Sequence, residues 1–279
     1  MPEGPEVKII VDQLNQNFKN KQILSVDLHE PRYLSRQKKF NWLIGCTLNQ
    51  VIRKAKYLIW QFSSEHKQIY CINHLAMTGT WNIRKFKRSI YCRFSFEFDN
   101  HVYLDFLDMR KWGKFDIFTS EEFYNEKIQN KLNELGKDAL EEEITVTYLT
   151  QQLNSLKERR KIIEIKPLLM EQTFLSGIGN IYASEICFLS SINPFQNVKT
   201  LTSENIENLT EAINTVLNEA YKNGGSTIKN YTNVNGEKGN AQFHHMIYGL
   251  KTCRLCNSKV LKGPQENRTT FWCPNCQKW

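Results

Sequence analysis

Residues 93–106, RFSFEFDNHVYLDF, decide the fold of the first half of the chain. Phe94, Phe96 and Phe98 alternate with polar residues, so the three rings fall on one side of a strand. Asp99-Asn100 then supplies turn residues, and the alternation resumes after them. The stretch therefore predicts an antiparallel β-hairpin with one buried face.

The same type of pattern extends toward the N-terminus. Residues 51–62, 68–77 and 91–98 have the composition of strands, whereas residues 5–18 repeat apolar side chains at helical spacing. Several strands that follow a single N-terminal helix predict a β-sandwich or a barrel-like domain.

The second half of the chain changes to helical periodicity, and residues 141–143 form an acidic stretch suited to a linker. The predicted helices are Thr145–Leu156, Ile163–Phe174, Asn180–Leu189 and Ser203–Tyr221. Residues 229–242 contain glycine and few apolar residues, which favours a mobile loop. We expect three domains, at residues 1–140, 141–245 and 246–279.

Charge and hydropathy narrow the class of protein. The chain has 279 residues, 37 Lys and Arg against 29 Asp and Glu, a net charge of +8 and a hydrophobic content of 41%. This balance favours a polyanionic partner such as nucleic acid. The chain has neither a signal-like leader nor an apolar run long enough to span a bilayer, so we expect a soluble intracellular protein with no membrane partner. Cytoplasm, nucleoid and nucleus stay open.

Four cysteines near the C-terminus have metal-site spacing: Cys253-x2-Cys256, sixteen residues, then Cys273-x2-Cys276. Two such knuckles present four thiolates to one tetrahedral Zn²⁺, and this leaves no open position for catalysis. The predicted zinc is therefore structural. Arg268, between the pairs, could fork onto a phosphate, although a solvated hairpin is the simpler interpretation.

Gly177-Ile178-Gly179-Asn180 falls between two predicted helices. Amides at the start of the second helix could hold a phosphate, with the Asn180 side chain as a further donor. A plain bend between two helices explains the glycines equally well.

The N-terminal segment permits two interpretations. Pro2 and Glu3 precede an amphipathic helix, and Glu6 falls in its first turn, which is ordinary helix-start composition. If Met1 is removed, however, Pro2 carries a free secondary amine with a pKa near ~8, which is suited to Schiff-base chemistry. Glu3 and Glu6 would then be acid/base partners within one turn.

Two further segments combine apolar and basic side chains: HLAMTG at residues 74–79 and DMRKWG at residues 108–113. Met77, at a predicted strand end, and Trp112 fit ordinary core and half-buried surface positions. If they meet on one surface with Arg110, they instead suit filling the hole left by a base swung out of a duplex.

These motifs, in this order, resemble the bacterial formamidopyrimidine-DNA glycosylase and endonuclease VIII family. They are MPEGPEV at 1–7, RKAKYL at 53–58, HLAMTG at 74–79, DMRKWG at 108–113, IKPLLM at 165–170, GIGNIYASE at 177–185, GGST at 224–227 and NRTTFWC at 267–273. HLAMTG and the Arg-x-aromatic segment make the match closer to formamidopyrimidine-DNA glycosylase. Together they cover essentially the whole chain.

The resemblance implies an α+β multidomain fold: an N-terminal helix with an antiparallel β-sandwich, a helix-two-turn-helix domain and a zinc-ribbon-like β-hairpin. It implies a monomeric bifunctional DNA glycosylase and abasic-site lyase of base excision repair. Its partner is double-stranded DNA that contains oxidised bases or abasic sites, and its cofactor is one structural Zn²⁺.

The resemblance also assigns the reacting groups. Pro2 is the nucleophile at C1′, Glu3 the acid/base residue and Glu6 a supporting carboxylate. Lys56 lies near the scissile phosphates. The strand is then cut by β,δ-elimination.

The remaining assignments concern DNA binding. Asn180 and Arg268 contact phosphates, and Lys166 lines the DNA channel. The void-filling residues are Met77, Arg110 and Trp112, with Trp where Phe is usual.

Two departures from the family pattern bear on the substrate. Asn240-Ala241 stands where an aromatic residue is common, which weakens the case for capping 8-oxoguanine. Met109 and Lys111 stand where Pro and Arg are typical. We therefore expect formamidopyrimidines and hydantoins to be better substrates than 8-oxoguanine, with oxidised pyrimidines also possible. A non-catalytic zinc-containing DNA-binding protein is the alternative, since Asn180, Arg268 and the charge do not require Pro2.

Overall fold

The computed structural model describes residues 1–99, 101–157, 162–226 and 231–278. The chain forms two compact units. Unit 1 consists of Met1–Asn133 together with Asn223–Asn240, and unit 2 of Glu134–Lys222 together with Ala241–Trp279. No helix of the described residues is both long and apolar enough to cross a membrane.

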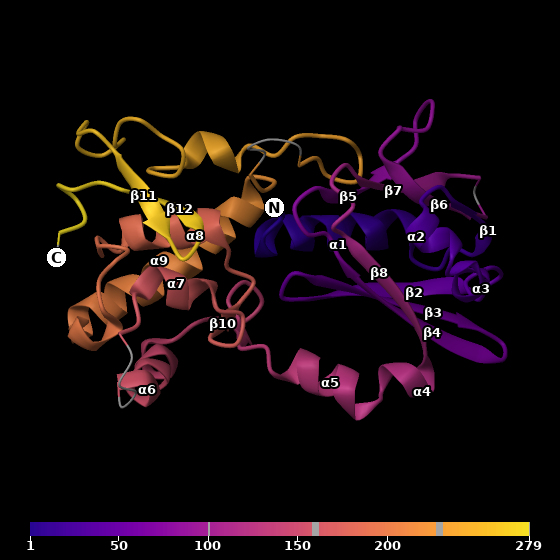
Figure 1. Ribbon diagram of the computed structural model, residues 1–279, viewed down its shortest axis with the longest axis horizontal. Coiled ribbons are helices and arrows are strands. Elements are labelled where there is room, and N and C mark those ends of the chain that lie inside the picture. The colour runs from indigo at the N-terminus through magenta and orange to yellow at the C-terminus, as the bar shows by residue number, and fades with distance from the viewer. Residues whose placement is uncertain (100, 158–161, 227–230, 279) are drawn as a thin grey trace. The chain divides into compact units, whose positions relative to one another are not determined.

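Unit 1 combines one long helix, α1 (Gly4–Phe18), with two four-stranded antiparallel sheets. The first sheet has the order β1 (Ile23–Leu28), β6 (Cys92–Phe98), β7 (Tyr103–Asp108), β5 (Gly79–Ile83). The second has the order β2 (Thr47–Lys54), β3 (Tyr57–Ser64), β4 (Lys67–His74), β8 (Lys114–Thr119). Short helices are α2 (Pro31–Leu34), α3 (Gln37–Asn41), α4 (Ser120–Phe123) and α5 (Glu126–Asn133). In the view of Figure 1, α1 runs with β5–β7 above it and β2–β4 below.

The β6–β7 hairpin is present, and its aromatic face forms the centre of unit 1. Phe94, Phe96 and Phe98 have no exposed surface, and they pack with Trp81 in one apolar cluster. On the polar face Arg93 and Ser95 are buried as well, contrary to the expectation, while Glu97 is half-buried. Arg93 is covered because its Nε donates to the Asp108 carbonyl and its guanidinium pairs with Glu30 at 3.2 Å.

Two strand predictions differ from the structure. Residues 51–62 form two strands and not one, because the chain reverses at Ala55, which has φ +55°. The predicted strand 68–77 ends at His74, so Met77 lies in the loop before β5 and not at a strand end.

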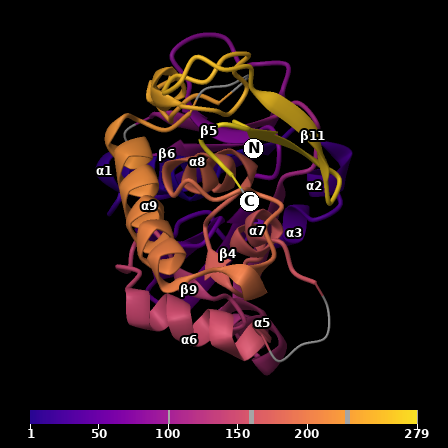
Figure 2. The same cartoon turned by 90° about the vertical axis from the view of Figure 1, so that its left-hand side faces the viewer.

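Unit 2 is mainly helical. Its helices are α6 (Val146–Lys157), α7 (Ile165–Met170), α8 (Asn180–Leu189), α9 (Ser203–Lys222), η1 (Val198–Thr200) and η2 (Ala241–His244). β9 (Lys137–Asp138) pairs in parallel with β10 (Leu175–Ser176), and β11 (Leu261–Gln265) forms an antiparallel hairpin with β12 (Arg268–Trp272). Figure 2 shows the long α9 steeply inclined to α6. The predicted helix 163–174 is shorter than expected, since α7 ends at Met170.

Of the predicted mobile loop, residues 231–240 belong to unit 1 and pack into its core. Tyr231 and Val234 belong to the buried cluster of that unit. The Val234 amide donates to Gln13 Oε1 at 2.9 Å, and its carbonyl accepts from the Ile83 amide at 2.9 Å. Two apolar residues thus anchor a segment whose overall composition suggests a free loop; residues 227–230 lie outside the described chain.

Candidate active site and nucleic-acid interface

The N-terminal segment starts a helix and still leaves Pro2 ahead of it, so the two interpretations of this segment are compatible. Glu3 is the N-cap of α1 and lies outside the helix, so Pro2 precedes the first turn. The Glu3 amide donates to Glu6 Oε2 at 2.8 Å, and the two side chains are 2% and 1% exposed respectively. The structure therefore places Pro2, Glu3 and Glu6 together at one end of α1, as the sequence predicts.

A glycine turn from the distant end of unit 1 holds the Glu6 carboxylate. The Ser226 amide donates to Glu6 Oε1 at 2.7 Å. Gly225 has φ +76°, and a Cβ at that position would stand 2.9 Å from the same oxygen. Burial and the Glu6 charge raise the pKa of the nearby Tyr231 well above its usual value. Gly225 and Ser226 are thus site residues that the sequence did not single out individually, although both belong to the GGST motif.

Lys56 lies beside a histidine that the sequence motifs did not single out for a role. Lys56 follows the Ala55 turn and is 8% exposed, and the neighbouring Tyr57 pairs with His74 across β3 and β4. Burial, followed by the charges of Lys56 and Lys114, lowers the pKa of His74 to about 4. The Ala76 amide donates to His74 Nδ1 at 3.2 Å, so the neutral ring carries its proton on Nε2. Lys56 and a neutral N–H donor here suit contact with a phosphate.

The two segments that carry the predicted void-filling residues, residues 74–79 and 108–113, meet, and they are called the wedge loops below. The Thr78 hydroxyl donates to Asp108 Oδ1 and accepts from the Arg110 amide at 3.0 Å. The Gly113 amide donates to Asp108 Oδ2 at 2.7 Å. Asp108 is fully buried, and it connects the loop that carries Met77 with the loop that carries Arg110.

The side chains that project from these loops are accessible. Trp112 is 56% exposed, and the Arg110 guanidinium lies 4.6 Å from its ring centroid. Met77 is half-buried. From α2, Arg32 donates to the carbonyls of Gly113 at 2.5 Å and Lys111 at 3.2 Å. The wedge loops are thus supported by a neighbouring helix.

In unit 2, the glycine turn orients Asn180 at the start of α8. Gly177 has φ +94°, which favours glycine. Lys166 Nζ donates to Asn180 Oδ1 at 2.7 Å, and Asn180 Nδ2 donates to the Thr269 carbonyl at 3.1 Å. Lys166 is 1% exposed, and its ammonium group orients the Asn180 side chain.

The C-terminal cysteines form a single cluster. The sulfurs of Cys253, Cys256, Cys273 and Cys276 lie within 4.8 Å of one another and could hold one metal ion. Cys253 and Cys276 have their sulfurs 3.9 Å apart. The four isolated cysteines, Cys46, Cys71, Cys92 and Cys187, are buried.

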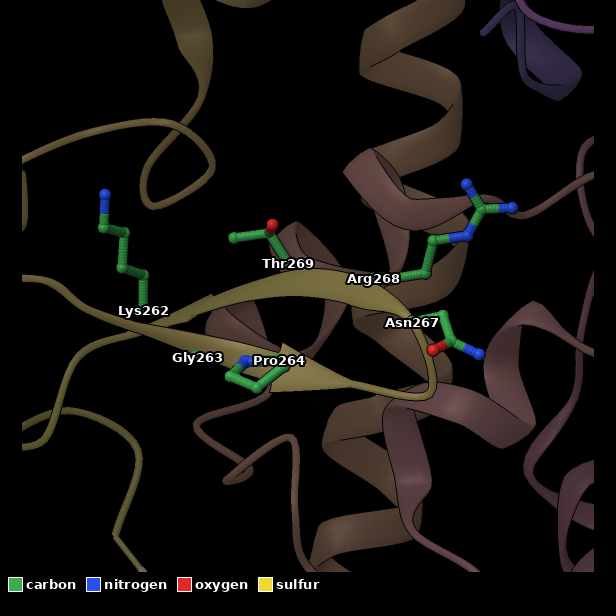
Figure 3. Close-up of a pocket in the computed structure, with 6 residues that line it drawn as sticks. All are labelled: Lys262, Gly263, Pro264, Asn267, Arg268 and Thr269. Carbon is green, nitrogen blue, oxygen red and sulfur yellow. The ribbon is translucent and has the colours of Figure 1, made fainter.

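The hairpin beside this cluster presents polar side chains to solvent. Lys262, Asn267, Arg268 and Thr269 line a shallow pocket on β11 and β12 (Figure 3). In that view Lys262, Thr269 and Arg268 extend away from the same side of the ribbon, with Arg268 near the turn. Because Thr269 also accepts from Asn180, the hairpin and the start of α8 form one polar surface within unit 2.

Comparisons with known proteins agree with this arrangement. The model of the formamidopyrimidine-DNA glycosylase N-terminal domain matches residues 1–115, and the formamidopyrimidine-DNA glycosylase H2TH domain matches residues 135–232. The formamidopyrimidine-DNA glycosylase of Bdellovibrio bacteriovorus is 33% identical over 100% of both chains, and that of Bacillus cereus is 33% identical over 99% of both.

Solved structures give the same result. The structure of Lactococcus lactis Fpg in complex with DNA that contains an abasic site has a TM-score of 0.86 and 28% identity, and it covers 99% of this chain and 100% of the other. Both domain models and full-length relatives thus match in sequence, and a solved relative matches in fold. The chain belongs to the formamidopyrimidine-DNA glycosylase family and is a DNA glycosylase.

Proposed function

We propose that the chain excises oxidised bases from double-stranded DNA through the Pro2 amine and then cuts the strand by β,δ-elimination. The position of Pro2, directly ahead of two buried carboxylates at the start of α1, carries this proposal. A terminal amine has a pKa near ~8, so a useful fraction is neutral at physiological pH. A secondary amine can form an iminium with C1′, and both steps need this linkage.

Base excision and strand cleavage both proceed through one covalent bond, between the Pro2 nitrogen and C1′ of the damaged nucleotide. The Pro2 nitrogen attacks C1′, the glycosidic bond breaks, and the base leaves with its electron pair and a proton. The C1′–O4′ bond then breaks, O4′ takes a proton, and the nitrogen lone pair forms the iminium at C1′. The resulting iminium acidifies C2′, so loss of that proton expels the 3′-phosphate, and a second elimination expels the 5′-phosphate. Hydrolysis releases the sugar remnant and restores the amine.

Glu3 and Glu6 have different parts in this scheme. Glu3 adjoins Pro2 and would shuttle protons during opening of the sugar ring. Glu6 accepts backbone hydrogen bonds from Glu3 and Ser226 at 2.8 and 2.7 Å, so it supports the geometry of the Glu3 segment. We therefore assign Glu6 as a positioning residue.

DNA contacts are assigned to both units. Lys56 in unit 1, with Asn180 and Arg268 in unit 2, would bind phosphates. Met77, Arg110 and Trp112 would fill the space left by the extruded nucleotide, since the first and last are accessible apolar groups and the second is a stacked guanidinium.

We further propose that the metal is one Zn²⁺ held by Cys253, Cys256, Cys273 and Cys276. Four thiols at knuckle spacing are the ligand set of a closed tetrahedral zinc site. Because all four positions are taken by protein, the ion would stabilise the hairpin that presents Arg268 and would not activate water.

For the substrate we propose that formamidopyrimidines and hydantoins are excised faster than 8-oxoguanine. Asn240 is exposed and Ala241 is small and buried, so neither position offers an aromatic ring to cap the base. Related Lactococcus lactis Fpg structures are described with DNA that contains Fapy-dG or an oxidised pyrimidine. Single-turnover excision on matched duplexes tests this order, and equal or faster release of 8-oxoguanine opposite cytosine would contradict it.

The catalytic assignment is tested by borohydride trapping on abasic-site DNA. Protein with a free Pro2 should give a covalent complex and strand cleavage. Retention of Met1 should abolish both, whereas Pro2→Gly should still trap because glycine presents a primary amine. If protein with a free Pro2 binds DNA but neither traps nor cuts it, the non-catalytic binding protein is the correct interpretation.

A further inference from the structure

The loop between β5 and β6, residues 84–91 (RKFKRSIY), combines exposed apolar side chains with positive charge. It contains four cations and no acidic residue. Phe86 is 88% exposed and Ile90 is 85% exposed, which makes them the two most exposed large apolar residues within the described part of the chain. Lys85 and Lys87 flank Phe86 and are also exposed.

Both ends of the loop are fixed, so these side chains are held on the surface. At the first end, the Arg84 guanidinium lies 2.6 Å from Asp105 and the Arg84 amide donates to the Tyr103 carbonyl at 2.8 Å. At the second end, the Cys92 amide donates to the Ser89 carbonyl at 3.1 Å. The segment between them projects from the sheet in Figure 1.

The second end also adjoins the wedge. The Asp108 amide donates to the Tyr91 carbonyl at 3.0 Å, and Asp108 is the residue that joins the two wedge loops. Met109, next in the chain, is 45% exposed, and Tyr91 is 41% exposed. The C-terminal end of loop 84–91 therefore adjoins the start of the segment that carries Arg110 and Trp112.

We propose that loop 84–91 is an additional DNA-contact element, which binds the duplex beside the extruded nucleotide. Lys85 and Lys87 would bind phosphates, and Phe86 and Ile90 would pack on sugars and base edges. The positive charge without any acid fits the DNA backbone, and the hydrogen bond between Tyr91 and Asp108 places the C-terminal end of the loop beside the wedge loops. The proposal rests on the proposed function only in taking the wedge as the DNA-facing surface.

The length of the loop limits its reach. Phe86 is five residues from Tyr91, so the chain between them spans at most ~17 Å. At ~3.4 Å per base pair, this reach from Tyr91 corresponds to about five base pairs of duplex. The contact should therefore depend on flanking duplex on one side of the lesion only.

The salt dependence of binding tests the phosphate contacts. Each contact contributes about 0.9 to the slope of log Kd against log salt, so Lys85→Ala with Lys87→Ala should reduce the slope by about 1.8. Between 50 and 200 mM salt, the wild-type protein should therefore lose about twelvefold more affinity than this variant. The probe is a duplex that contains a stable abasic-site analogue.

A matched control removes the same charge elsewhere. Lys19→Ala with Lys21→Ala changes two lysines at the same spacing, just after α1, whose 15 residues set them about 22 Å along the helix from Pro2. This control should keep the wild-type slope. Phe86→Ala with Ile90→Ala should weaken binding without changing the slope, whereas Leu24→Ala, another exposed apolar residue, should not weaken it.

Duplexes with one long and one short flank complete the test. The Lys85 and Lys87 variant should show its defect on duplexes extended on one side by about five base pairs, and lose that defect when the same side is cut to about two. Unchanged slopes on both designs, or equal loss in the Lys19 and Lys21 control, would overturn the proposal. Borohydride trapping at saturating protein should persist in every variant. If the wild-type protein fails to trap, the proposed Pro2 chemistry is contradicted. The salt slopes would still test whether loop 84–91 contacts DNA.

Discussion

The Thr78 hydroxyl donates a hydrogen bond to the buried carboxylate of Asp108, and this contact joins the two loops that carry Met77 and Arg110. The same hydroxyl accepts from the Arg110 amide at 3.0 Å. One side chain thus sets the separation of two loops that are 30 residues apart in the sequence. The wedge is a preassembled unit whose spacing depends on this pair.

We predict that Thr78→Val lowers kcat/KM for excision from duplex DNA by about tenfold. The valine has a similar shape but leaves the Asp108 carboxylate and the Arg110 amide without this partner, a loss of about 1–3 kcal/mol. Single-turnover excision measures the effect. Trapping on single-stranded abasic DNA, which needs no wedge, should stay unchanged.

The control for Thr78→Val is Thr210→Val, which removes another buried hydroxyl, one that donates to the Ile206 carbonyl within α9. It should leave excision unaffected. Equal losses on single-stranded and duplex DNA for Thr78→Val would show that the contact supports folding in general and not the wedge.

A second prediction concerns the turn that holds Glu6. In Gly225→Ala the new Cβ would stand 2.9 Å from Glu6 Oε1, so the carboxylate must move, and a displacement of this kind should slow trapping at Pro2 roughly ten- to hundredfold. The left-handed backbone alone costs about 1–2 kcal/mol. Trapping rates on abasic DNA, together with thermal unfolding, separate the two effects.

Gly45→Ala supplies the matched control in the same unit. Gly45 has φ +79°, and a Cβ at this position would meet no atom within 4 Å, so this variant has the backbone strain but no contact with Glu6. It should lose stability and keep its trapping rate. If both variants slow trapping equally, the Gly225 contact with Glu6 is not the cause.

The sequence predicts the parts of this structure that depend on local patterns. The alternation of apolar and polar residues predicts the β6–β7 hairpin, and the spacing of the four C-terminal cysteines predicts their cluster. It does not predict the reversal at Ala55, because the turn Lys54-Ala55-Lys56-Tyr57 contains no Gly, Pro or Asn to mark it. The local amino-acid composition is therefore insufficient to locate this turn.

Long-range contacts account for the other differences. Lys166 is buried because its partner, Asn180, lies on another helix 14 residues away. Tyr231 and Val234 are in the core of unit 1 although they follow helix α9 of unit 2. His74 has its pKa lowered by burial and by the charges of Lys56 and Lys114, which are distant in the sequence. A single sequence carries no signal for such contacts between distant residues. The order of the motifs nevertheless identified the segments in which several of these residues lie.

The low pKa of His74 predicts a loss of stability in acid. The folded-state value of about 4 lies below the ordinary 6.5, so the unfolded chain takes up the proton first. The stabilisation is complete above pH 6.5 and is lost as pH falls toward 4. Between about pH 7 and pH 5 this one group should cost about 2 kcal/mol.

Urea unfolding at the two pH values, read on a signal from unit 1, measures this cost. His74→Gln keeps an acceptor for the Ala76 amide but cannot titrate, so its stability should change less over the same range. His66→Gln is the control for replacing a histidine, at a position that is 91% exposed. An identical pH dependence in wild type and His74→Gln would contradict the assignment.

The last prediction concerns the metal. Purified protein should contain one zinc per chain, and Cys256→Ser should remove it, because a three-thiol site binds zinc more weakly. Loss of the ion should disorder the β11–β12 hairpin and weaken DNA binding at least as much as Arg268→Ala, since it displaces Arg268 together with the Thr269 carbonyl that accepts from Asn180. Arg268→Ala itself should keep its zinc and lose affinity independently of sequence, with a salt slope lower by about 0.9. Elemental analysis and binding to an abasic-site duplex give both readouts. A zinc-free Cys256→Ser protein with wild-type affinity would show that the hairpin is ordered without the metal.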